Sequence, residues 1–249
     1  MSSDTIVWIT GATSGIGEAM AATVPYADAR VINIARRIHP TLESVQADIS
    51  DPAGWNAIDK HLQAELATFT GTRAIFVHNA FLPEPVGFIG EIDPDAYRRH
   101  ILANAAAPLI IGEMFLRHLP NGIEGGLVMM SSAAARIPYA ARAGYGSGKA
   151  AMEQWVKVVR LELAEHRPES WVVAVRPGAV DTPSFRADAA GDPETNPVAA
   201  AMQAALDAGL VDSSEVAARR IWDALPPAPG TKPVLLFGEM VAPPRKDTV

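Results

Sequence analysis

The chain has 249 residues, 49% of them hydrophobic, and a formal net charge of −7. This length and apolar content can bury the core of one α/β domain, and the negative charge argues against nonspecific binding to nucleic acid. Without cysteine the chain forms neither a disulfide framework nor a thiolate metal site. Its six histidines show no ligand-like spacing, so we expect no metal.

Targeting and membrane signals are missing from this sequence. The first residues are polar and do not form a charged region followed by an apolar core. No apolar run approaches the length of a membrane span, about eighteen residues. We therefore expect a cytoplasmic protein that interacts with neither a membrane nor a nucleic acid.

The first predicted elements are a strand, a glycine turn and a helix. The apolar run Ile6–Thr10 leads through Gly11–Gly17 into a helical pattern over Gly15–Pro25. Glycines permit a tight turn and let backbone amides approach a pyrophosphate, whose charge the positive end of the helix dipole favours. The spacing Gly-x-x-x-Gly-x-Gly departs from the Gly-x-Gly-x-x-Gly fingerprint, so an ordinary strand-to-helix turn is the alternative.

The end of the second predicted strand, Ala29–Ala35, indicates which dinucleotide binds. In a dinucleotide fold an acidic residue near this point binds the ribose hydroxyls, whereas an arginine accommodates a 2′-phosphate. Here Arg36 and Arg37 follow the strand, without a carboxylate at the expected position. Because a guanidinium stays charged and donates two parallel hydrogen bonds, the pair predicts NADP(H). Two merely solvated arginines are the alternative.

Strands and helices alternate along the rest of the chain. This alternation predicts right-handed crossovers and a doubly wound α/β fold, with a central parallel sheet flanked by helices on both faces. The further predicted strands are a short one before Asp48, then Arg73–His78, Gly126–Ser131, Trp171–Arg176 and Pro233–Phe237. The further predicted helices are Pro52–Phe69, Ile101–Leu119, Arg142–His166 and Ser214–Leu225.

The composition shifts in two segments near the carboxy-terminal end. Asp181–Pro197 is rich in Asp, Pro and Ala, which predicts a flexible loop. Pro226–Lys232 predicts a connector to the last strand.

Tyr145 and Lys149 form a Tyr-x-x-x-Lys pair within a predicted helix. A separation of four residues places both side chains on one helix face, so an ammonium can lie beside a phenol. A free phenol has a pKa of about 10, and a neighbouring cation favours the phenolate, which makes the phenol a better proton donor at neutral pH. By itself the pair also fits an ordinary solvated helix face.

Several motifs occur together in the order and spacing of the short-chain dehydrogenase/reductase family, which the chain resembles over nearly its whole length. The resemblance implies one NAD(P)-binding Rossmann domain over residues 1–249. It also implies a substrate lid around 181–212, for which a variable surface loop is the alternative. The motifs are Thr10–Gly17, Asn79-Ala80, Asn104, Ser132, Tyr145 with Lys149, and Pro177-Gly178.

The resemblance implies roles for the catalytic residues. Ser132 or its neighbour Ser131 would bond the substrate carbonyl oxygen. Because neighbours on a strand face opposite sides, only one can do so, and we select Ser132. Tyr145 would donate the proton, Lys149 would lower the Tyr145 pKa and bond the nicotinamide ribose, and Asn104 would hold a water linking the lysine to solvent. A helix-bending asparagine without a catalytic part is the alternative for Asn104.

The resemblance also implies cofactor contacts at the carboxyl ends of the strands. Asp48 and Ile49 would meet the adenine, although Asp48 could simply turn the chain. The sequence departs from the family at Phe81, where glycine is usual, and at His78, where a second asparagine is common. The implied contacts are Gly11, Thr13, Ser14, Gly15, Ile16, Gly17, Arg36, Arg37, Asp48, Ile49, Asn79, Ala80, Tyr145, Lys149, Pro177, Gly178, Val180 and Thr182.

The function implied by the resemblance is NADPH-dependent reduction of a ketone or aldehyde to an alcohol. One alternative is a non-enzymatic NADPH sensor, which would be expected to lack part of the catalytic set. Another is an epimerase or dehydratase, which usually belongs to a longer chain. Pro83–Gly87 with Ile92-Asp93 loosely resembles the benzil and sepiapterin reductase branch, which reduces vicinal dicarbonyls. The family commonly forms homodimers or homotetramers through the helices that begin here near Ile101 and Arg142, and we expect the same.

Overall fold

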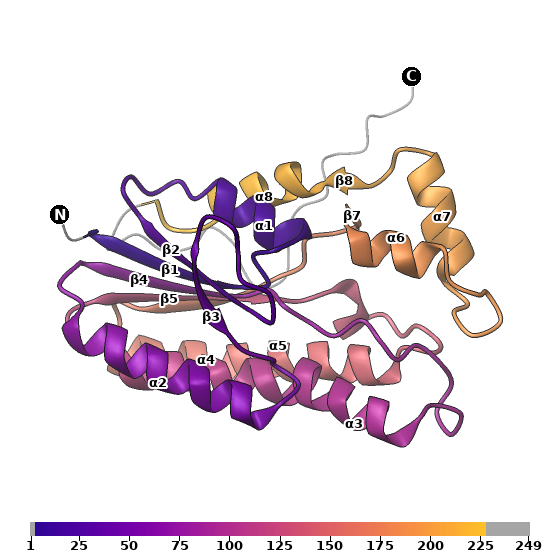
Figure 1. Ribbon diagram of the computed structural model, residues 1–249, viewed down its shortest axis with the longest axis horizontal. Helices are drawn as coiled ribbons and strands as arrows, with labels where there is room; N and C mark the ends of the chain where they lie inside the picture. The colour runs from indigo at the N-terminus through magenta and orange to yellow at the C-terminus, as the bar shows by residue number, and fades with distance from the viewer. Residues whose placement is uncertain (1–2, 228–249) are drawn as a thin grey trace.

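In the computed structural model, which describes residues 3–227, six parallel strands form one sheet in the order β3-β2-β1-β4-β5-β6 (Figure 1). The strand order reverses between β1 and β4, where a doubly wound sheet opens a crevice at the carboxyl ends of its strands. The predicted fold is confirmed, while the predicted strand Pro233–Phe237 lies outside the described residues. The strands are β1 (Thr5–Thr10), β2 (Arg30–Ala35), β3 (Glu43–Gln46), β4 (Arg73–His78), β5 (Glu124–Met130) and β6 (Trp171–Val175).

Helices cover both faces of the sheet, with α2, α4 and α5 on one face and α1 and α8 on the other (Figure 1). Each face has its own core because side chains alternate along a strand: Trp8 of β1 packs toward the first layer, and Val7 and Ile9 pack toward the second. Among the helices of the described residues, none is long and apolar enough to cross a membrane. The helices are α1 (Gly15–Ala22), α2 (Pro52–Thr68), α4 (Ala107–His118), α5 (Ala143–His166) and α8 (Ser214–Asp223).

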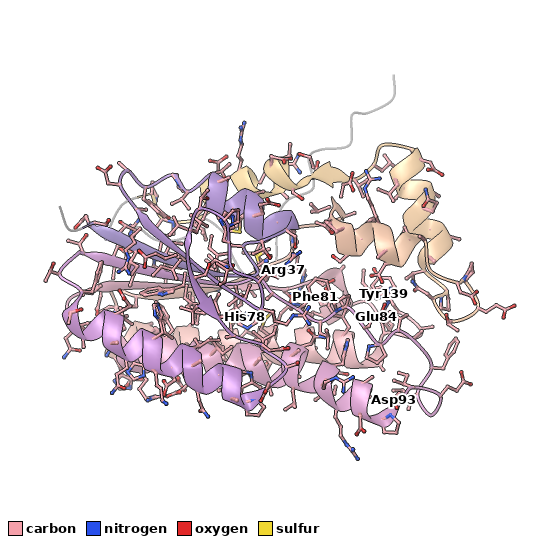
Figure 2. The ribbon with its side chains drawn as sticks, in the orientation of Figure 1. Arg37, His78, Phe81, Glu84, Asp93 and Tyr139 are labelled. Atoms are coloured by element: carbon pink, nitrogen blue, oxygen red, sulfur yellow. The ribbon has the colours of Figure 1, made fainter. Side chains whose placement is uncertain are left out.

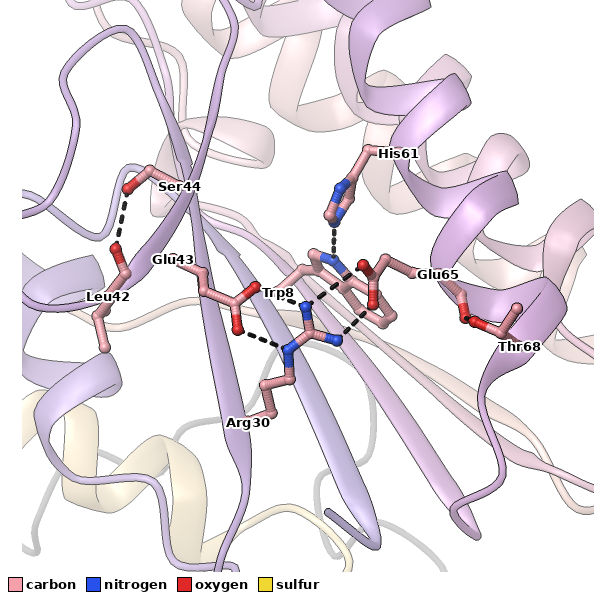
Figure 3. Close-up of polar contacts among 8 residues, drawn as sticks. All are labelled: Trp8, Arg30, Leu42, Glu43, Ser44, His61, Glu65 and Thr68. Carbon is pink, nitrogen blue, oxygen red and sulfur yellow. Dashed lines mark hydrogen bonds and ion pairs between the residues drawn. The ribbon is translucent and has the colours of Figure 1, made fainter. Parts of the chain in front are cut away.

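Polar contacts tie β2 and β3 to α2 at one edge of the sheet. Arg30 donates from Nε to Glu43 at 2.7 Å and also pairs with Glu65 (Figure 3). The indole Nε1 of Trp8 donates to His61 at 3.0 Å. Because the Arg30 side chain is 36% exposed, its ion pairs add little stability, and the fully buried Trp8 is the stronger anchor.

The helix predicted over Ile101–Leu119 begins earlier and is interrupted. Its first part is α3 (Pro94–Ile101), which the side chain of Asp93 caps. A π-helical turn, Leu102–Ala106, separates α3 from α4. The predicted start was wrong because a capping aspartate followed by a first-turn proline marks the earlier boundary.

The chain between β6 and α8 folds into short elements at the carboxyl end of the sheet (Figure 1). The predicted flexible loop over Asp181–Pro197 is wrong where α6 forms, because Thr182 caps this helix through a hydrogen bond from Phe185 N to Thr182 Oγ1 at 3.1 Å. A two-residue parallel pairing of β7 with β8 closes the segment at its base. The elements are β7 (Val180–Asp181), α6 (Pro183–Ala189), α7 (Ala199–Asp207) and β8 (Asp212–Ser213).

Candidate active site

The glycine turn after β1 has a backbone that only glycine fits. Gly11 and Gly15 have φ of +73° and +57°, in the left-handed region. A Cβ on Gly17 would lie 2.3 Å from the carbonyl oxygen of Gly11 and 2.5 Å from Nδ2 of Asn79. The turn is therefore packed tightly against the segment that follows β4.

Asn79 and Ala80 hold this segment against the end of β1. Their backbone N–H groups both donate to Thr10 Oγ1 at 2.9 Å, and Asn79 Nδ2 donates to the Thr10 carbonyl oxygen at 3.0 Å. The structure thus brings the Asn79-Ala80 motif beside the glycine turn.

The amino terminus of α1 begins in this turn. Ser14 occupies the N-cap position with an extended backbone, and its side chain makes no capping hydrogen bond. The first amide groups of α1 are therefore not capped by Ser14, and such amides can bind a phosphate. Thr13 precedes this cap, and Ile16, in the first turn of α1, packs partly into the core.

The segment after β6 reaches the same turn. A Cβ on Gly15 would lie 3.1 Å from Cγ2 of Thr182, so these two residues are neighbours. Gly178 has a φ of +83°, which turns the chain after Pro177, and Val180 is buried in β7. Of the predicted contacts in this segment, Thr182 lies beside the glycine turn, and the cofactor contacts of the segment stay predictions.

Arg37 extends from the end of β2 to the glycine turn. Its Nη2 donates to Thr13 Oγ1 at 3.1 Å, and its carbonyl oxygen accepts from Asn33 Nδ2 at 3.1 Å. The Arg36 carbonyl oxygen accepts from Gln46 Nε2 at 2.9 Å. Both arginine side chains are exposed. Arg37 is the arginine that contacts the glycine turn, through Thr13.

Asp48 and Ile49 accept hydrogen bonds from nearby residues in the chain after β3. Oδ1 of Asp48 accepts from Ser50 N at 2.8 Å and from Ser50 Oγ at 2.7 Å, which turns the chain toward α2. The Ile49 carbonyl oxygen accepts from Trp55 Nε1 at 2.7 Å. The turn-forming role left open for Asp48 is thus present, and its contact with adenine stays a prediction.

The two adjacent serines after β5 have different partners. Ser131 is buried and donates to Glu153 Oε1 at 2.7 Å, while Glu153 also binds Arg176 Nε at 2.6 Å. Ser132 is half-buried, and its Oγ accepts from Ala134 N at 3.2 Å at the start of a short 3-10 turn. Ser131 therefore binds the buried ion pair of Glu153 with Arg176. Ser132 is the serine that faces Tyr145, with which it shares a hydrogen bond.

Tyr145 lies in the first turn of α5 beside Ser132. Burial of its hydroxyl raises the pKa of the phenol, whereas hydrogen bonding by Ser132 and the charge of Arg142 act to lower it. In this structure the lowering comes from Ser132 and Arg142, while the Lys149 ammonium donates to a backbone carbonyl oxygen. The expected effect of Lys149 on the Tyr145 pKa stays a prediction.

Lys149 is buried between α5 and the end of β5. Its Nζ donates to the Met130 carbonyl oxygen at 2.6 Å and lies 5.5 Å from the centre of the Tyr145 ring and 5.9 Å from that of Phe81. Burial lowers the pKa of Lys149 to about 8, because the ammonium loses its hydration. The side chain is thus close to neutral at mildly alkaline pH.

Asn104 lies in the π-helical turn between α3 and α4, a feature often found at functional sites. Its Oδ1 accepts from Leu82 N at 2.9 Å, and its Nδ2 donates to the Leu82 carbonyl oxygen at 2.8 Å. A Cβ on Gly148 would lie 2.6 Å from the Asn104 carbonyl oxygen, so glycine is needed where the two helices touch. Asn104 therefore positions the chain around Phe81, and a water-holding role stays a prediction.

Phe81 replaces the usual glycine without disturbing the local backbone contacts of Asn79 and Ala80. Its ring centre lies 5.7 Å from that of Tyr145, at a tilt of 53°. Figure 2 shows Arg37, His78 and Phe81 near the carboxyl ends of the strands. The aromatic ring thus forms one wall beside the proposed proton donor.

Sequence reasoning missed a polar bridge between α5 and the segment that carries α6. Arg142 donates from Nη2 to Asp188 Oδ1 at 3.1 Å and to Asn196 Oδ1 at 3.2 Å. Asn196 in turn donates to the Asp188 carbonyl oxygen at 2.9 Å. The one sequence signal was an arginine three residues before Tyr145, and its distant partners have no recognisable spacing. Within residues 3–227, no group of three or more His, Asp or Glu side chains is placed to hold a metal.

Comparison with known proteins identifies the family. Residues 5–192 match the family described as short chain dehydrogenase. The chain therefore belongs to the short-chain dehydrogenase family, whose members are oxidoreductases that use nicotinamide cofactors.

Relatives with assigned activities include two reductases. The chain is 24% identical to benzil reductase ((S)-benzoin forming) of Bacillus cereus, over 71% of this chain and 76% of that protein. It is 30% identical to L-xylulose reductase of Bos taurus, over 75% of each. Among solved structures, a short chain dehydrogenase from Burkholderia cenocepacia J2315 in complex with NADP shares the fold, with a TM-score of 0.69, 20% identity and 95% of each chain covered.

Proposed function

We propose that this protein is an NADPH-dependent reductase that converts a ketone or aldehyde to an alcohol, with Tyr145 as general acid. The observation that carries the proposal is the meeting of Ser132 and Tyr145 beside buried Lys149, at the same strand ends as the glycine turn. Two hydroxyls and an ammonium at this position fit a carbonyl oxygen that gains negative charge during reduction.

The bound cofactor would supply a hydride to the carbonyl carbon. Ser132 would donate a hydrogen bond to the carbonyl oxygen and hold the substrate in line with the proton donor. Tyr145 would give its proton to that oxygen, so the hydride and the proton together complete the alcohol. Lys149 would stabilise the resulting phenolate and bond the nicotinamide ribose.

Preference for NADPH is supported by the position of Arg37. Its guanidinium donates to Thr13 at the glycine turn. At this position its permanent positive charge would bind a 2′-phosphate on the adenosine ribose. The uncapped first turn of α1 and the positive φ of Gly11 and Gly15 fit the pyrophosphate. These residues are the ones that would hold the cofactor.

A vicinal dicarbonyl is the substrate class that we propose, supported by the relative named benzil reductase. Phe81 offers an aromatic surface beside Tyr145 on which a planar conjugated substrate can stack. Arg142 is the N-cap residue of the same helix and can polarise a second carbonyl oxygen. The segment around 181–212 would act as the substrate lid.

We also propose a cytoplasmic homodimer or homotetramer that associates through the faces of α4 and α5. Val158 and Leu161 on α5 support this, because 44% and 74% of their surfaces are exposed despite their apolar character. One molecule would then be a single Rossmann domain whose catalytic helix also forms the contact.

The experiment that tests the function measures loss of reduced-nicotinamide absorbance with NADPH and with NADH against diketones, aldehydes and cyclic ketones. The adjacent serines provide a matched pair of variants. Ser132→Ala should reduce kcat by about a hundredfold or more with NADPH binding retained. Ser131→Ala should keep most of the activity and instead lower stability, because it leaves Glu153 with one hydrogen bond fewer. Tight NADPH binding with no turnover of any carbonyl would favour a sensor instead.

A further inference from the structure

His78 is a buried histidine that the proposed chemistry does not use. It ends β4 (Figure 2) and is only 2% exposed. Among the described residues, its Nε2 atom has no hydrogen-bond partner. A buried polar atom without a partner is costly and rare, so its surroundings must explain it.

The backbone directs this side chain toward the catalytic helix. Residues two apart on a strand share a face, so His78 faces the same side as Phe76. Phe76 belongs to the core that contains Met152 and Val156 of α5. In the sheet, His78 pairs in register with Met129 of β5.

The Lys149 side chain extends from α5 to the carboxyl ends of β4 and β5. Its Nζ donates to the carbonyl oxygen of Met130, the residue after the partner of His78. Neighbouring strands lie about 4.8 Å apart, so the end of β4 and the bonded carbonyl are adjacent. The charge of Lys149 also acts on the imidazole of His78, which places the two groups within electrostatic reach.

The imidazole is a neutral acceptor at physiological pH. Burial first and the Lys149 charge second lower the pKa of His78 to about 3. A hydrogen bond with its own backbone acts in the opposite direction. Since Nε2 has no partner, that bond uses Nδ1, and the proton on Nδ1 leaves a lone pair on Nε2.

The Lys149 ammonium can donate more hydrogen bonds than the one to Met130. Lys149 has three N–H groups, and the structure assigns one of them to Met130. The groups near it include Tyr145 on its own helix, His78 from β4 and the ring of Phe81 from the loop after β4. The buried carboxylate of Glu153, one turn further along α5, is bonded to Ser131 and Arg176, so the acceptor that we consider for Lys149 is the neutral imidazole.

We propose that His78 is a positioning residue for Lys149, whose ammonium donates to His78 Nε2 through one buried water. The contact keeps the buried lysine protonated and aimed at the site of the nicotinamide ribose. An asparagine, common at this position in the family, would offer an amide oxygen to the same donor. The consequence for reduction rests on the proposed function, whereas the contact itself does not.

Cofactor binding as a function of pH tests the proposal without needing a substrate. NADPH fluorescence would be titrated from about pH 6 to about pH 9.5 with wild type, His78→Leu, His78→Asn and Lys149→Met. Wild type should lose affinity as Lys149 deprotonates, with a midpoint near the pKa of about 8. His78→Leu should move this midpoint down by about one pH unit, and His78→Asn should restore it. Lys149→Met should remove the pH-dependent part altogether.

An unchanged midpoint in His78→Leu would overturn the proposal, as would an equal shift in His78→Asn. If His78→Leu does not fold, ¹⁵N NMR of wild type decides the matter: we expect the Nδ1–H tautomer across this pH range, and an Nε2–H tautomer would contradict it. Failure of wild type to bind either NADPH or NADH would overturn the proposed function alone. The NMR result would still decide the role of His78.

Discussion

Glycine backbone geometry fixes the proposed cofactor side of the candidate site, whereas polar side chains hold its proposed substrate side. On the cofactor side, Gly17 leaves no room for a Cβ against Gly11. On the substrate side, Arg142 joins α5 to Asp188 and Asn196 through hydrogen bonds and an ion pair. The first arrangement admits one residue type, while the second admits graded changes, so specificity can vary on the substrate side without loss of the cofactor site.

The largest effect on stability that we predict comes from the buried lysine. The folded-state pKa of Lys149 lies below its ordinary value, so burying the charge destabilises the protein fully below about pH 8, and this penalty disappears as the pH rises toward 10.5. Lys149→Met should therefore raise the free energy of unfolding at pH 7 by up to about 3 kcal/mol. It should also flatten the rise in stability between about pH 8 and about pH 9.5.

Urea unfolding across this pH range measures that effect. Lys157→Met, on the exposed side of the same helix, is the control and should change stability by about 0.5 kcal/mol or less. A Lys149→Met protein less stable than wild type at pH 7 would mean that the hydrogen bond to Met130 outweighs the burial cost.

Substitution of Gly17 tests the rigidity of the cofactor side. Gly17→Ala would place a Cβ 2.3 Å from the Gly11 carbonyl oxygen, so we expect a loss of about 1–3 kcal/mol in stability and weaker NADPH binding. In Gly87→Ala the new Cβ would meet only the Ile92 side chain at 3.3 Å. Calorimetry of both variants with and without NADPH should separate them, and equal losses would contradict the assigned rigidity.

The two arginines after β2 sharpen the cofactor prediction. Arg37→Glu should weaken NADPH binding by about ten- to a hundredfold while sparing NADH, because the lost charge would face the 2′-phosphate. Arg36→Asp should shift the preference in the same direction but less, since only Arg37 contacts Thr13 in the described structure. Dissociation constants for both cofactors test this, and a loss shared equally by NADPH and NADH would remove the phosphate assignment.

The smallest predicted effect lies on the substrate side. Arg142→Gln should raise KM for the carbonyl by about three- to tenfold, roughly 0.7–1.4 kcal/mol, and leave the NADPH dissociation constant unchanged. Arg186→Gln is the control, because Arg186 lies on α6 but pairs with Asp181 at the surface. A change in cofactor affinity in Arg142→Gln would show that the two sides are not separate.

The difference between the two sides also explains what the sequence could predict. Strand, glycine turn and helix follow each other locally from Ile6 to Ala22, and the resemblance to the family supplied Asn79, Ser132 and Tyr145 at their distant positions. The π-helical turn at Asn104 could not be predicted, because the other residues of the turn are leucine and alanine, which are good helix formers, and one extra residue per turn leaves no compositional mark. Likewise, nothing in the local sequence pairs Arg142 with Asp188.

The short helix α6 was missed for a different reason. Thr182 followed by Pro183 is a cap and a first-turn proline, but the aspartates and prolines around it suggested a loop. The direction of Lys149 could not be predicted either, since helical spacing places it near Tyr145 without fixing where its ammonium points.

The most direct test of the proposed reductase is a single-turnover measurement on Tyr145→Phe. Enzyme loaded with NADPH would be mixed with a vicinal dicarbonyl, and oxidation of the cofactor followed by absorbance. Our account predicts that the variant binds NADPH as wild type does and oxidises it at least about a hundredfold more slowly, because the general acid is gone. Oxidation at the wild-type rate by a variant without the phenol hydroxyl would contradict the assignment of Tyr145 as the proton donor.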